Sequence, residues 1–593
     1  MKKIFIYSII LISFLFIISI VVAFFFLPEL IGRSGGAEVT PENEPSDNPI
    51  IALKYRVGSD NTEIEIPIHG SYSNLTIFWG CGEKTAVPAG TGAKRISHVY
   101  AEKGEYLVQI DGSFMTGFGL AGRVEGGLSL EASAKGMEYL VEVISWRDRG
   151  ISSFNQAFYG AERLIAVPKE LPLGVTNLSF MFGKAQAFDQ SLNEWDTSGV
   201  RDMSLLFKDA QAFNQPLDSW DTSGVVDMRH MFSGALSFNQ SVDGWDTANV
   251  TDMSSMFKDA RTFDQPLDGW DTVNVVLTRS MFEGAVSFNR PLGSWDMSKV
   301  VDMSRMFENT PVFDQSLESW NTSNANNMSG VFKGARSFNR DISSWDTSNV
   351  KDMTEMFREA VVFNQPLESW DTGQVESMRG MFQGSSFNRP INNWNTGSVK
   401  DMSSMFSDVL SYNQPVGDWD TGKVTDMNSM FKNAKFFNQN INSWDTANVN
   451  DMSFMFFNAV SFNRPLDEWD TSKVINMSSM FNGASSFNQP IGNWDTGRVK
   501  NMRLMFANAS SFDQPLDGWE TVKVTDMGSM FQNAGSFNQD LSVWCVLGIS
   551  EIPSSFDSGA DSWFKGATST RPYWGSCPSE DVPEGEDSVD LED

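Results

Sequence analysis

Histidine and cysteine are the scarcest reactive residues of this 593-residue chain, which contains three of each. His69 and His98 lie in one stretch of mixed sequence, and His230 lies far from both, in a strongly repetitive region. Because His230 stands where other repeats have serine or arginine, we expect an exposed variant and no catalytic base. No Ser-His-Asp set, Cys-His pair or glycine-rich phosphate loop is present, and an active site needs a unique constellation of such groups. We therefore predict a protein that is not an enzyme, with a carbohydrate-active enzyme as an alternative.

The three cysteines divide into a candidate pair and a single residue. Cys545 interrupts the last copy of the repeat, and Cys577 lies in the run that closes the folded part of the chain. Both places suit a disulfide that staples a C-terminal cap, which fits an oxidising compartment. Cys81 is left over, and we expect a small buried apolar residue there, with a reactive thiol as the alternative.

Carboxylates are abundant, but they recur at equivalent places instead of forming one unique group. One ladder stands directly before a repeated methionine: Asp202, Asp227, Asp252, Asp302, Asp352, Asp401, Asp426 and Asp451. We interpret it as acidic residues in the first turn of a helix, near its positive end. The alternative pairs it with Asp196, Asp221 and Asp246 as repeated calcium ligands. No glycine-rich calcium-repeat motif is present, so no cofactor is expected, and calcium stays an alternative.

A ladder of glutamines and arginines supplies the candidate binding residues. It stands five residues before a repeated tryptophan, and its candidates are Arg290, Arg340, Arg389, Arg464, Gln215, Gln265 and Gln315. An acidic ladder that includes Asp218, Asp243 and Glu318 stands two residues before the same tryptophan. One interpretation is a polar face that keeps the protein soluble through ordinary arginine-to-acid pairs. The other is a recognition face whose arginines meet anionic or sugar groups of a partner.

A tandem repeat positions all of these ladders. Its tryptophans are Trp195, Trp220, Trp245, Trp270, Trp295, Trp320, Trp345, Trp370, Trp394, Trp419, Trp444, Trp469, Trp494, Trp519 and Trp544. The spacing is 25 residues with a single step of 24, and a fixed period in this range indicates a repeat architecture. One such unit cannot bury its apolar face alone, so neighbouring coils must stack into a solenoid with a continuous core.

Within one repeat, the spacing of apolar residues predicts a short helix and a short strand. Val225, Met228, Met231 and Phe232 form a helical stripe, and Gly234 marks its end. The segment 213–220 is too short for a second helix, and we expect a strand there. An Asn or Asp ladder that includes Asn214 should satisfy backbone groups at a bend. The predicted fold class is α/β: a leucine-rich-repeat-type solenoid of about 17 coils, roughly 80 Å long.

The repeat resembles a known family. Phe-Asn-Gln, Trp-Asp-Thr-Ser, Val-x-Asp-Met and Met-Phe are similar to the motifs of BspA-like leucine-rich-repeat surface proteins, over residues 139 to 567. The resemblance implies a secreted or surface-anchored protein used for adhesion or recognition. Trp, Phe and Met replace the usual Leu and Ile. We place the solenoid at residues 138–567 and a C-terminal cap with an acidic disordered tail at residues 568–593.

The N-terminal region combines an apolar segment with a spacer. Lys2 and Lys3 precede an uncharged apolar run from Ile4 to Leu27, which is long enough to span a bilayer. We predict a signal anchor at residues 1–28 with the N-terminus in the cytoplasm and the rest outside. The alternative is a cleaved signal peptide and a secreted protein. Residues 29–50, which contain a run rich in Pro, Glu, Asn and Asp, are predicted to be a flexible linker.

Residues 51–137 read as a small β-sandwich, because alternating apolar stretches are separated by glycine-bearing turns. The run Trp79-Gly80-Cys81-Gly82, followed by His98-Val99-Tyr100, resembles PKD-like domains of surface proteins. Those domains normally carry Asp where Cys81 stands, so the resemblance implies the sandwich fold and no ion site.

The composition limits the classes of partner that the protein is expected to bind. A formal net charge of −31 argues against nucleic acid, because affinity for phosphates needs basic surface. We predict a single-pass cell-surface adhesion or recognition protein that binds an extracellular protein or glycan through its solenoid. The alternative is a structural, self-associating surface protein without a specific ligand.

Overall fold

The structure is a computed structural model that describes residues 45, 47–122, 133–563 and 571–578. The chain divides into two compact units, Met1–Asn48 and Pro49–Asp593, and nearly all described residues belong to the second. The predicted membrane anchor, most of the linker and most of the acidic tail lie outside the described residues. Among the residues that are described, no helix has the length and apolar character needed to cross a bilayer.

Two antiparallel sheets form the first part of the second unit. One has the order β4 (Lys84–Val87), β3 (Leu75–Phe78), β7 (Gly104–Asp111), β1 (Ile51–Val57) and β9 (Leu140–Trp146). The other has β5 (Gly90–Thr91), β2 (Thr62–Tyr72) and β6 (Lys94–Tyr100), with β8 (Met115–Phe118) also paired to β2. A single 3-10 helix, Met137–Tyr139, precedes β9 among the described residues. The strands thus extend past the predicted boundary at residue 137, as far as Trp146.

The sheets lead directly into the coils. Gly117 in β8 forms a parallel bridge with Ser153, and Glu142 in β9 forms one with Ala166. The ring of Phe118 lies 5.9 Å from that of Phe158, so one apolar core runs from the strands into the solenoid. The sheets therefore cover the first coil.

The segment predicted to be a helix is a ribbon of consecutive turns. In the coil at 203–210, the amides of Leu205 and Phe207 donate to carbonyls of the next coil, at 2.9 Å each. The intervening amide of Leu206 donates back to the carbonyl of Met203 within its own coil. Leu205 and Asp209 have φ of 57° and 59°, a left-handed conformation that an α-helix cannot contain. The helix prediction is therefore wrong, because alternate amides bond to the neighbouring coil instead of to residue i−4.

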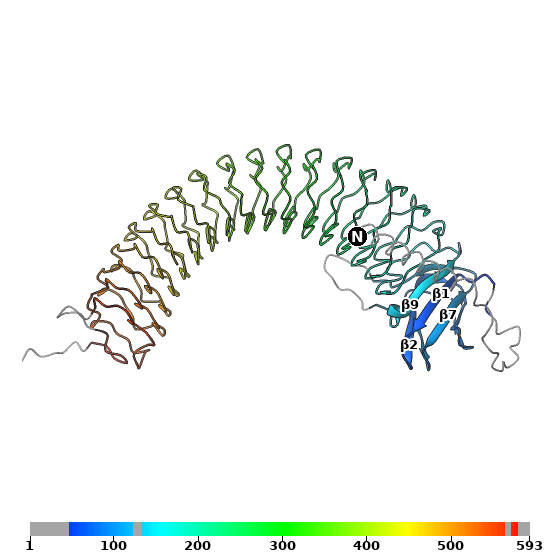
Figure 1. The fold of residues 1–593 in the computed structure, drawn as a ribbon, viewed down its shortest axis with the longest axis horizontal. Coiled ribbons are helices and arrows are strands. Elements are labelled where there is room, and N and C mark those ends of the chain that lie inside the picture. The colour runs from blue at the N-terminus through cyan, green and yellow to red at the C-terminus, as the bar shows by residue number, and fades with distance from the viewer. Residues whose placement is uncertain (1–44, 46, 123–132, 564–570, 579–593) are drawn as a thin grey trace, which may run out of the picture. The chain divides into compact units, whose positions relative to one another are not determined.

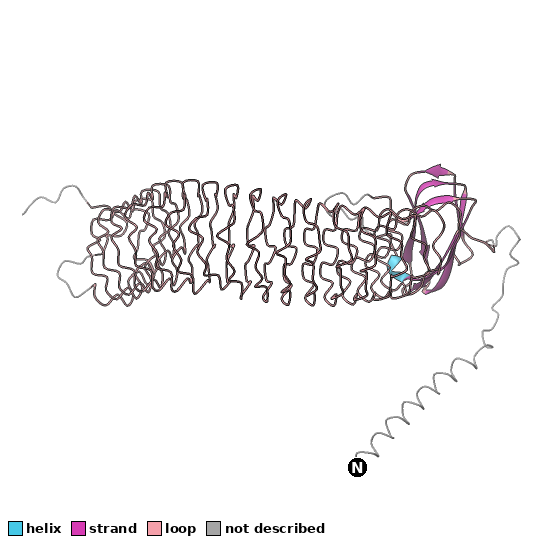
Figure 2. Ribbon diagram, turned by 90° about the horizontal axis from the view of Figure 1, so that it is seen from above, coloured by secondary structure: helices cyan, strands magenta, loops and turns pink. Residues whose placement is uncertain are grey.

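The strand prediction for 213–220 is also wrong. The only parallel bridges between regular coils in the described residues lie at the other side of the repeat, where Asp202, Asp227 and Asp252 pair in succession. At the predicted strand, side chains hold the coils together. The Oδ1 of Asn214 accepts the amide of Asn239 in the next coil at 2.9 Å, which confirms the role predicted for the asparagine ladder. The fold is a solenoid of turns and single bridges (Figure 2).

Stacked aromatic rings fill the core and bend the stack of coils. Ring centroids are 5.6 Å apart for Phe207 and Phe232, next to the bridges, and 6.4 Å apart for Trp220 and Trp245, on the opposite side. Coils therefore lie closer at the bridges than at the tryptophans, and the side with the bridges is concave. Consecutive coils follow one another side by side in Figure 1.

Candidate functional site: a polar groove on the bridge face

The bridge face is the concave surface built by four positions of each coil, which in one coil are Asp227, Arg229, His230 and Ser233. The first position is Asp in most coils, but the residues at the other three change from coil to coil, unlike the Trp-Asp-Thr segment that recurs along most of the array. A groove of about 760 Å³ follows this face over the coils between Leu205 and Ser329. It is the candidate site, because it brings side chains of several different coils to one surface.

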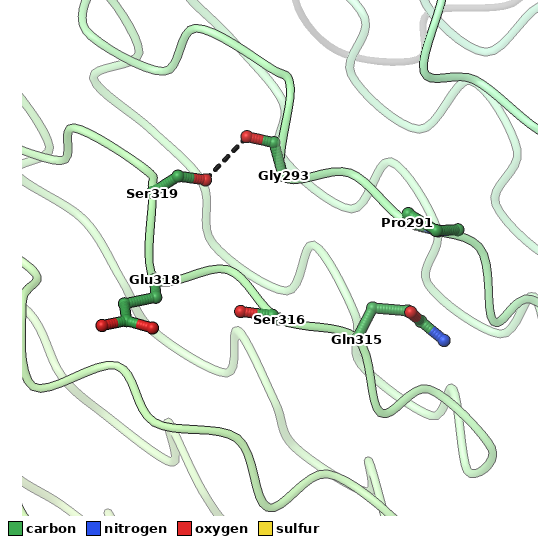
Figure 3. A pocket seen from close by; sticks show the side chains of 6 residues that line it. All are labelled: Pro291, Gly293, Gln315, Ser316, Glu318 and Ser319. Carbon is green, nitrogen blue, oxygen red and sulfur yellow. Dashed lines mark hydrogen bonds between the residues drawn. The ribbon is translucent and has the colours of Figure 1, made fainter.

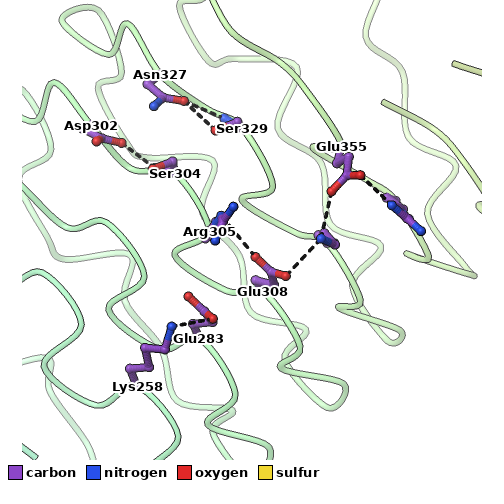
Figure 4. Close-up of polar contacts among 11 residues, drawn as sticks. Lys258, Glu283, Asp302, Ser304, Arg305, Glu308, Asn327, Ser329 and Glu355 are labelled. Atoms are coloured by element: carbon purple, nitrogen blue, oxygen red, sulfur yellow. Dashed lines mark hydrogen bonds and ion pairs between the residues drawn. The ribbon is translucent and has the colours of Figure 1, made fainter. Parts of the chain in front are cut away.

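Bridge aspartates fix the backbone of this face. Oδ1 of Asp252 accepts the amide of Ser254 at 2.8 Å, and Oδ1 of Asp302 accepts that of Ser304 at 2.9 Å. Figure 4 shows the same arrangement at Asn327 and Ser329. In such turns, the side-chain oxygen accepts a hydrogen bond from the amide two residues later in the chain. The prediction that these aspartates lie in the first turn of a helix is therefore wrong. Across the part of the chain that the structure describes, no cluster of three or more acidic, histidine or cysteine residues could hold a metal ion.

The two aspartate ladders differ electrostatically. Burial raises the pKa of the Asp227 carboxyl to about 6, against hydrogen bonding and charge from Arg229. In the other ladder, hydrogen bonds from the hydroxyl and then the amide of Ser198 hold the pKa of Asp196 below its usual value. Of these two carboxyls, that of Asp227 on the bridge face is thus the harder one to ionise.

His230 is half-buried in the groove and not exposed as the sequence suggested. Burial lowers the pKa of its ring to about 4, and the positive charges of Lys208 and Lys258 lower it further. Its Nδ1 is buried without a hydrogen-bond partner. The imidazole is therefore neutral at pH 7 and stands among cations.

A chain of ion pairs borders the groove. Glu308 lies 3.6 Å from Arg305 and 3.2 Å from Lys333, and Lys333 lies 2.8 Å from Glu355. Glu355 in turn lies 2.5 Å from Arg358. Partly exposed pairs contribute little stability one by one, but a network restricts the side chains that it joins. The network ends at Arg305, whose side chain is 58% exposed in the groove.

The predicted binding residues lie away from this groove and join adjacent coils. Arg290 donates through Nη2 to Oδ2 of Asp264 at 2.8 Å, and Arg340 donates likewise to Asp314 at 2.7 Å. Each of the others donates to the preceding coil: Arg389 to Asn364, Arg464 to Asn438, Gln215 to Asp189, Gln265 to Asn239 and Gln315 to Asn289. Gln315 also lines an open hollow with Gly293 and Ser319 (Figure 3). Their binding role stays a prediction, but their hydrogen bonds already connect the coils.

Two of the three cysteines are joined to each other, and the third is free. Cys545 and Cys577 form a disulfide beside the last coil. Cys81 is free and exposed, so the expectation of a buried apolar residue is wrong. It lies in the loop after β3, next to Glu83 and to His98 of β6. No sequence motif indicated this group, because His98 lies on β6 and is far from Cys81 and Glu83 along the chain.

The architecture defines the class of protein as a repeat solenoid that displays a variable concave face. The chain belongs to the family described as "Mycoplasma protein of unknown function, DUF285", which matches residues 132–224, 152–245, 216–311, 287–386, 364–468 and 457–565. No curated protein matches. Among solved structures, the chain is similar to one titled "Crystal structure of TLR13-ssRNA13 complex", at 11% identity and a TM-score of 0.18, over 70% of this chain and 52% of that one. It thus spans about half of that chain, and the BspA-like and PKD-like resemblances stay predictions.

Proposed function

We propose that this protein is a cell-surface recognition or adhesion protein that binds an extracellular protein or glycan through the bridge face. The observation that carries the proposal is the groove of about 760 Å³, which gathers Arg279, Arg305 and Ser304 from successive coils. A solenoid that repeats its scaffold and varies one concave surface has the general form of a binding protein. The site replaces the glutamine and arginine ladder, whose side chains already hold neighbouring coils together.

The proposed location rests on the sequence and on the disulfide. The apolar run from Ile4 to Leu27 supports a single membrane anchor, and secretion after cleavage is the alternative. The bond between Cys545 and Cys577 supports an oxidising compartment. The net charge of −31 supports a partner other than nucleic acid.

A binding screen of the purified full-length chain tests the proposal. We would measure binding to a panel of extracellular matrix proteins and glycans, with the double variant Arg279→Glu, Arg305→Glu beside the wild type. The matched control is Arg389→Glu, Arg464→Glu, which reverses two charges on the opposite ladder. Saturable binding that only the first variant abolishes would support the proposal. If binding is equally sensitive to both variants, or if only concentration-dependent assembly in light scattering is seen, the bridge face is not a recognition surface.

A further inference from the structure

One register of the bridge face carries an arginine in a few coils, and the residue two positions before it differs among these coils. In the coil at 227, Nε of Arg229 lies 3.0 Å from Oδ2 of Asp227, two residues earlier. Arg279 occupies the same register two coils further on, but Leu277 stands where the aspartate would be. Among the described residues the guanidinium of Arg279 has no hydrogen bond or ion pair, and its side chain is exposed in the groove. A missing carboxylate thus leaves a free cation at this point.

The coil that contains Arg279 departs from the repeat at two adjacent positions. Where most other coils have Asp-Met, this coil has Leu277-Thr278. Thr278 takes the place of a core methionine, and its Oγ1 is buried without a hydrogen-bond partner. A buried hydroxyl without a partner costs stability. Leu277 and Thr278 therefore weaken the packing of this coil against its neighbours, at the same place where they leave Arg279 unpaired.

Arg279 is the unpaired cation among the described residues of this groove, in a protein that as a whole is strongly acidic. Arg229, Lys258 and Arg305 also line the groove, but each lies beside a carboxylate: that of Asp227 at 3.0 Å, Glu283 at 2.7 Å and Glu308 at 3.6 Å. An exposed guanidinium without a carboxylate of its own favours an anionic ligand over a cationic one.

The remaining lining favours a hydrophilic ligand. Hydroxyl groups come from Ser254, Ser255, Ser280, Ser304 and Ser329, and the apolar residues are Leu205 and Leu277. No Phe, Tyr or Trp side chain lines this groove in the described structure. Protein interfaces are usually anchored by Trp, Tyr and Arg, and of these three only Arg lines the groove in the described structure. Hydroxyl donors and arginines suit the hydroxyl and acid groups of a saccharide.

We propose that the groove binds an acidic glycan, whose carboxylate or sulfate group pairs with the free guanidinium of Arg279. This inference rests on the proposed function and names its ligand class. Arg279 can offer two parallel N–H donors to such a group, and Arg305 can contact the next acidic group along the glycan. Leu277 keeps Arg279 available.

The test restores the repeat instead of removing a side chain. Leu277→Asp places a carboxylate where Asp227 stands relative to Arg229, so it should neutralise Arg279 within a stable coil. We expect Leu277→Asp and Arg279→Gln each to weaken binding of the full-length chain to heparin or hyaluronate oligosaccharides by about tenfold or more. Asn476→Asp is the matched control, because it adds the same charge at a bridge position followed by Ser478 and should leave binding unchanged.

The possible results distinguish a wrong ligand class from a wrong binding site. Binding of neutral dextran as strong as that of the acidic oligosaccharides would overturn the proposal. So would acidic binding that survives both Leu277→Asp and Arg279→Gln. If Leu277→Asp does not fold, as judged by its thermal unfolding, Arg279→Gln decides alone. Loss of a protein partner, with no glycan binding at any stage, would retain the recognition face and reject the acidic glycan.

Discussion

The Sγ of Cys81 lies 3.4 Å from Nε2 of His98, in a chain whose sequence shows no Cys-His motif. The other ring nitrogen of His98, Nδ1, lies 3.8 Å from the carboxylate of Glu83, and the ring stacks on Trp79 with centroids 5.0 Å apart. An exposed thiol, a base and a carboxylate thus follow one another at the rim of the strands. Such an arrangement activates a thiol, because the imidazole can accept its proton.

We expect Cys81 to react with a chromogenic disulfide reagent in the native protein, at one thiol per chain. Burial lowers the pKa of His98, so its ring is neutral at pH 7 and can take the thiol proton. His98→Ala should slow the reaction several-fold at pH 7, and the wild-type rate should fall at acid pH as the imidazole becomes protonated. Stopped-flow absorbance measures both, and Cys81→Ser is the blank. Equal rates for His98→Ala and wild type would show that the imidazole does not assist.

The stacked tryptophans should contribute a large share of the stability of each coil. Trp320 is buried at 2% exposure and donates through Nε1 to the carbonyl of Leu292 at 2.8 Å. Trp320→Ala should lower the free energy of unfolding by about 3–5 kcal/mol, and hydrogen exchange should rise mainly in the neighbouring coils. Val312→Ala, at a position that is 42% exposed, is the control and should change little. Uniform acceleration of exchange along the whole array would contradict this local picture.

Asp227 should make stability fall as pH rises. Its folded pKa of about 6 is above its usual value, so the folded state holds the proton more tightly than the unfolded state does. The stabilisation from this group is complete at pH 3 and is lost as pH increases through 6. Asp227→Asn keeps the acceptor for the amide of Arg229 and should raise the free energy of unfolding at pH 7 by on the order of 2 kcal/mol.

Denaturant unfolding at pH 4 and pH 7 measures this effect, with Asp196→Asn as a control of opposite sign. The pKa of Asp196 is lowered, so its contribution is present at pH 7 and is lost as pH falls. Destabilisation by Asp227→Asn at pH 7 would mean that its pairing with Arg229 outweighs the cost of burial.

The arginine at position 340 should be replaceable by glutamine and not by glutamate. Arg340 donates to Asp314 in the preceding coil. One coil further on, Gln365 makes the equivalent bond to Asn339. Arg340→Gln should therefore leave the thermal midpoint nearly unchanged. Arg340→Glu places two carboxylates together and should lower it by a few degrees, less so at high salt. A loss of ligand binding without a change in stability would instead revive the predicted recognition role of this residue.

The sequence predicted what depends on the period and missed what depends on contacts between coils. Trp220 and Phe232 are buried as their 25-residue recurrence requires, and Asn214 holds the next coil as expected. The helix failed because the apolar spacing of Val225, Met228 and Met231 also arises in a ribbon of turns. The position that holds Asp209 in one coil holds Gly234 in the next, and both residue types tolerate a left-handed backbone. This pattern in the sequence was the available indication against a helix. The groove could not be predicted, since it depends on which edge of the coil is concave.

The direction of the amide bonds in the turn ribbons gives the two ends of the solenoid different chemistry. Each ribbon donates N–H groups to the following coil, as Leu205 does to Arg229, and offers carbonyls to the preceding one. Two like ends cannot complete each other, but unlike ends can, so uncovered copies would join only head to tail and form open filaments. Here β8 occupies one end, and the segment that contains Phe556 accepts the amide of Phe531 at the other. At both places the bonding edge of a coil is therefore partnered by a segment of the same chain.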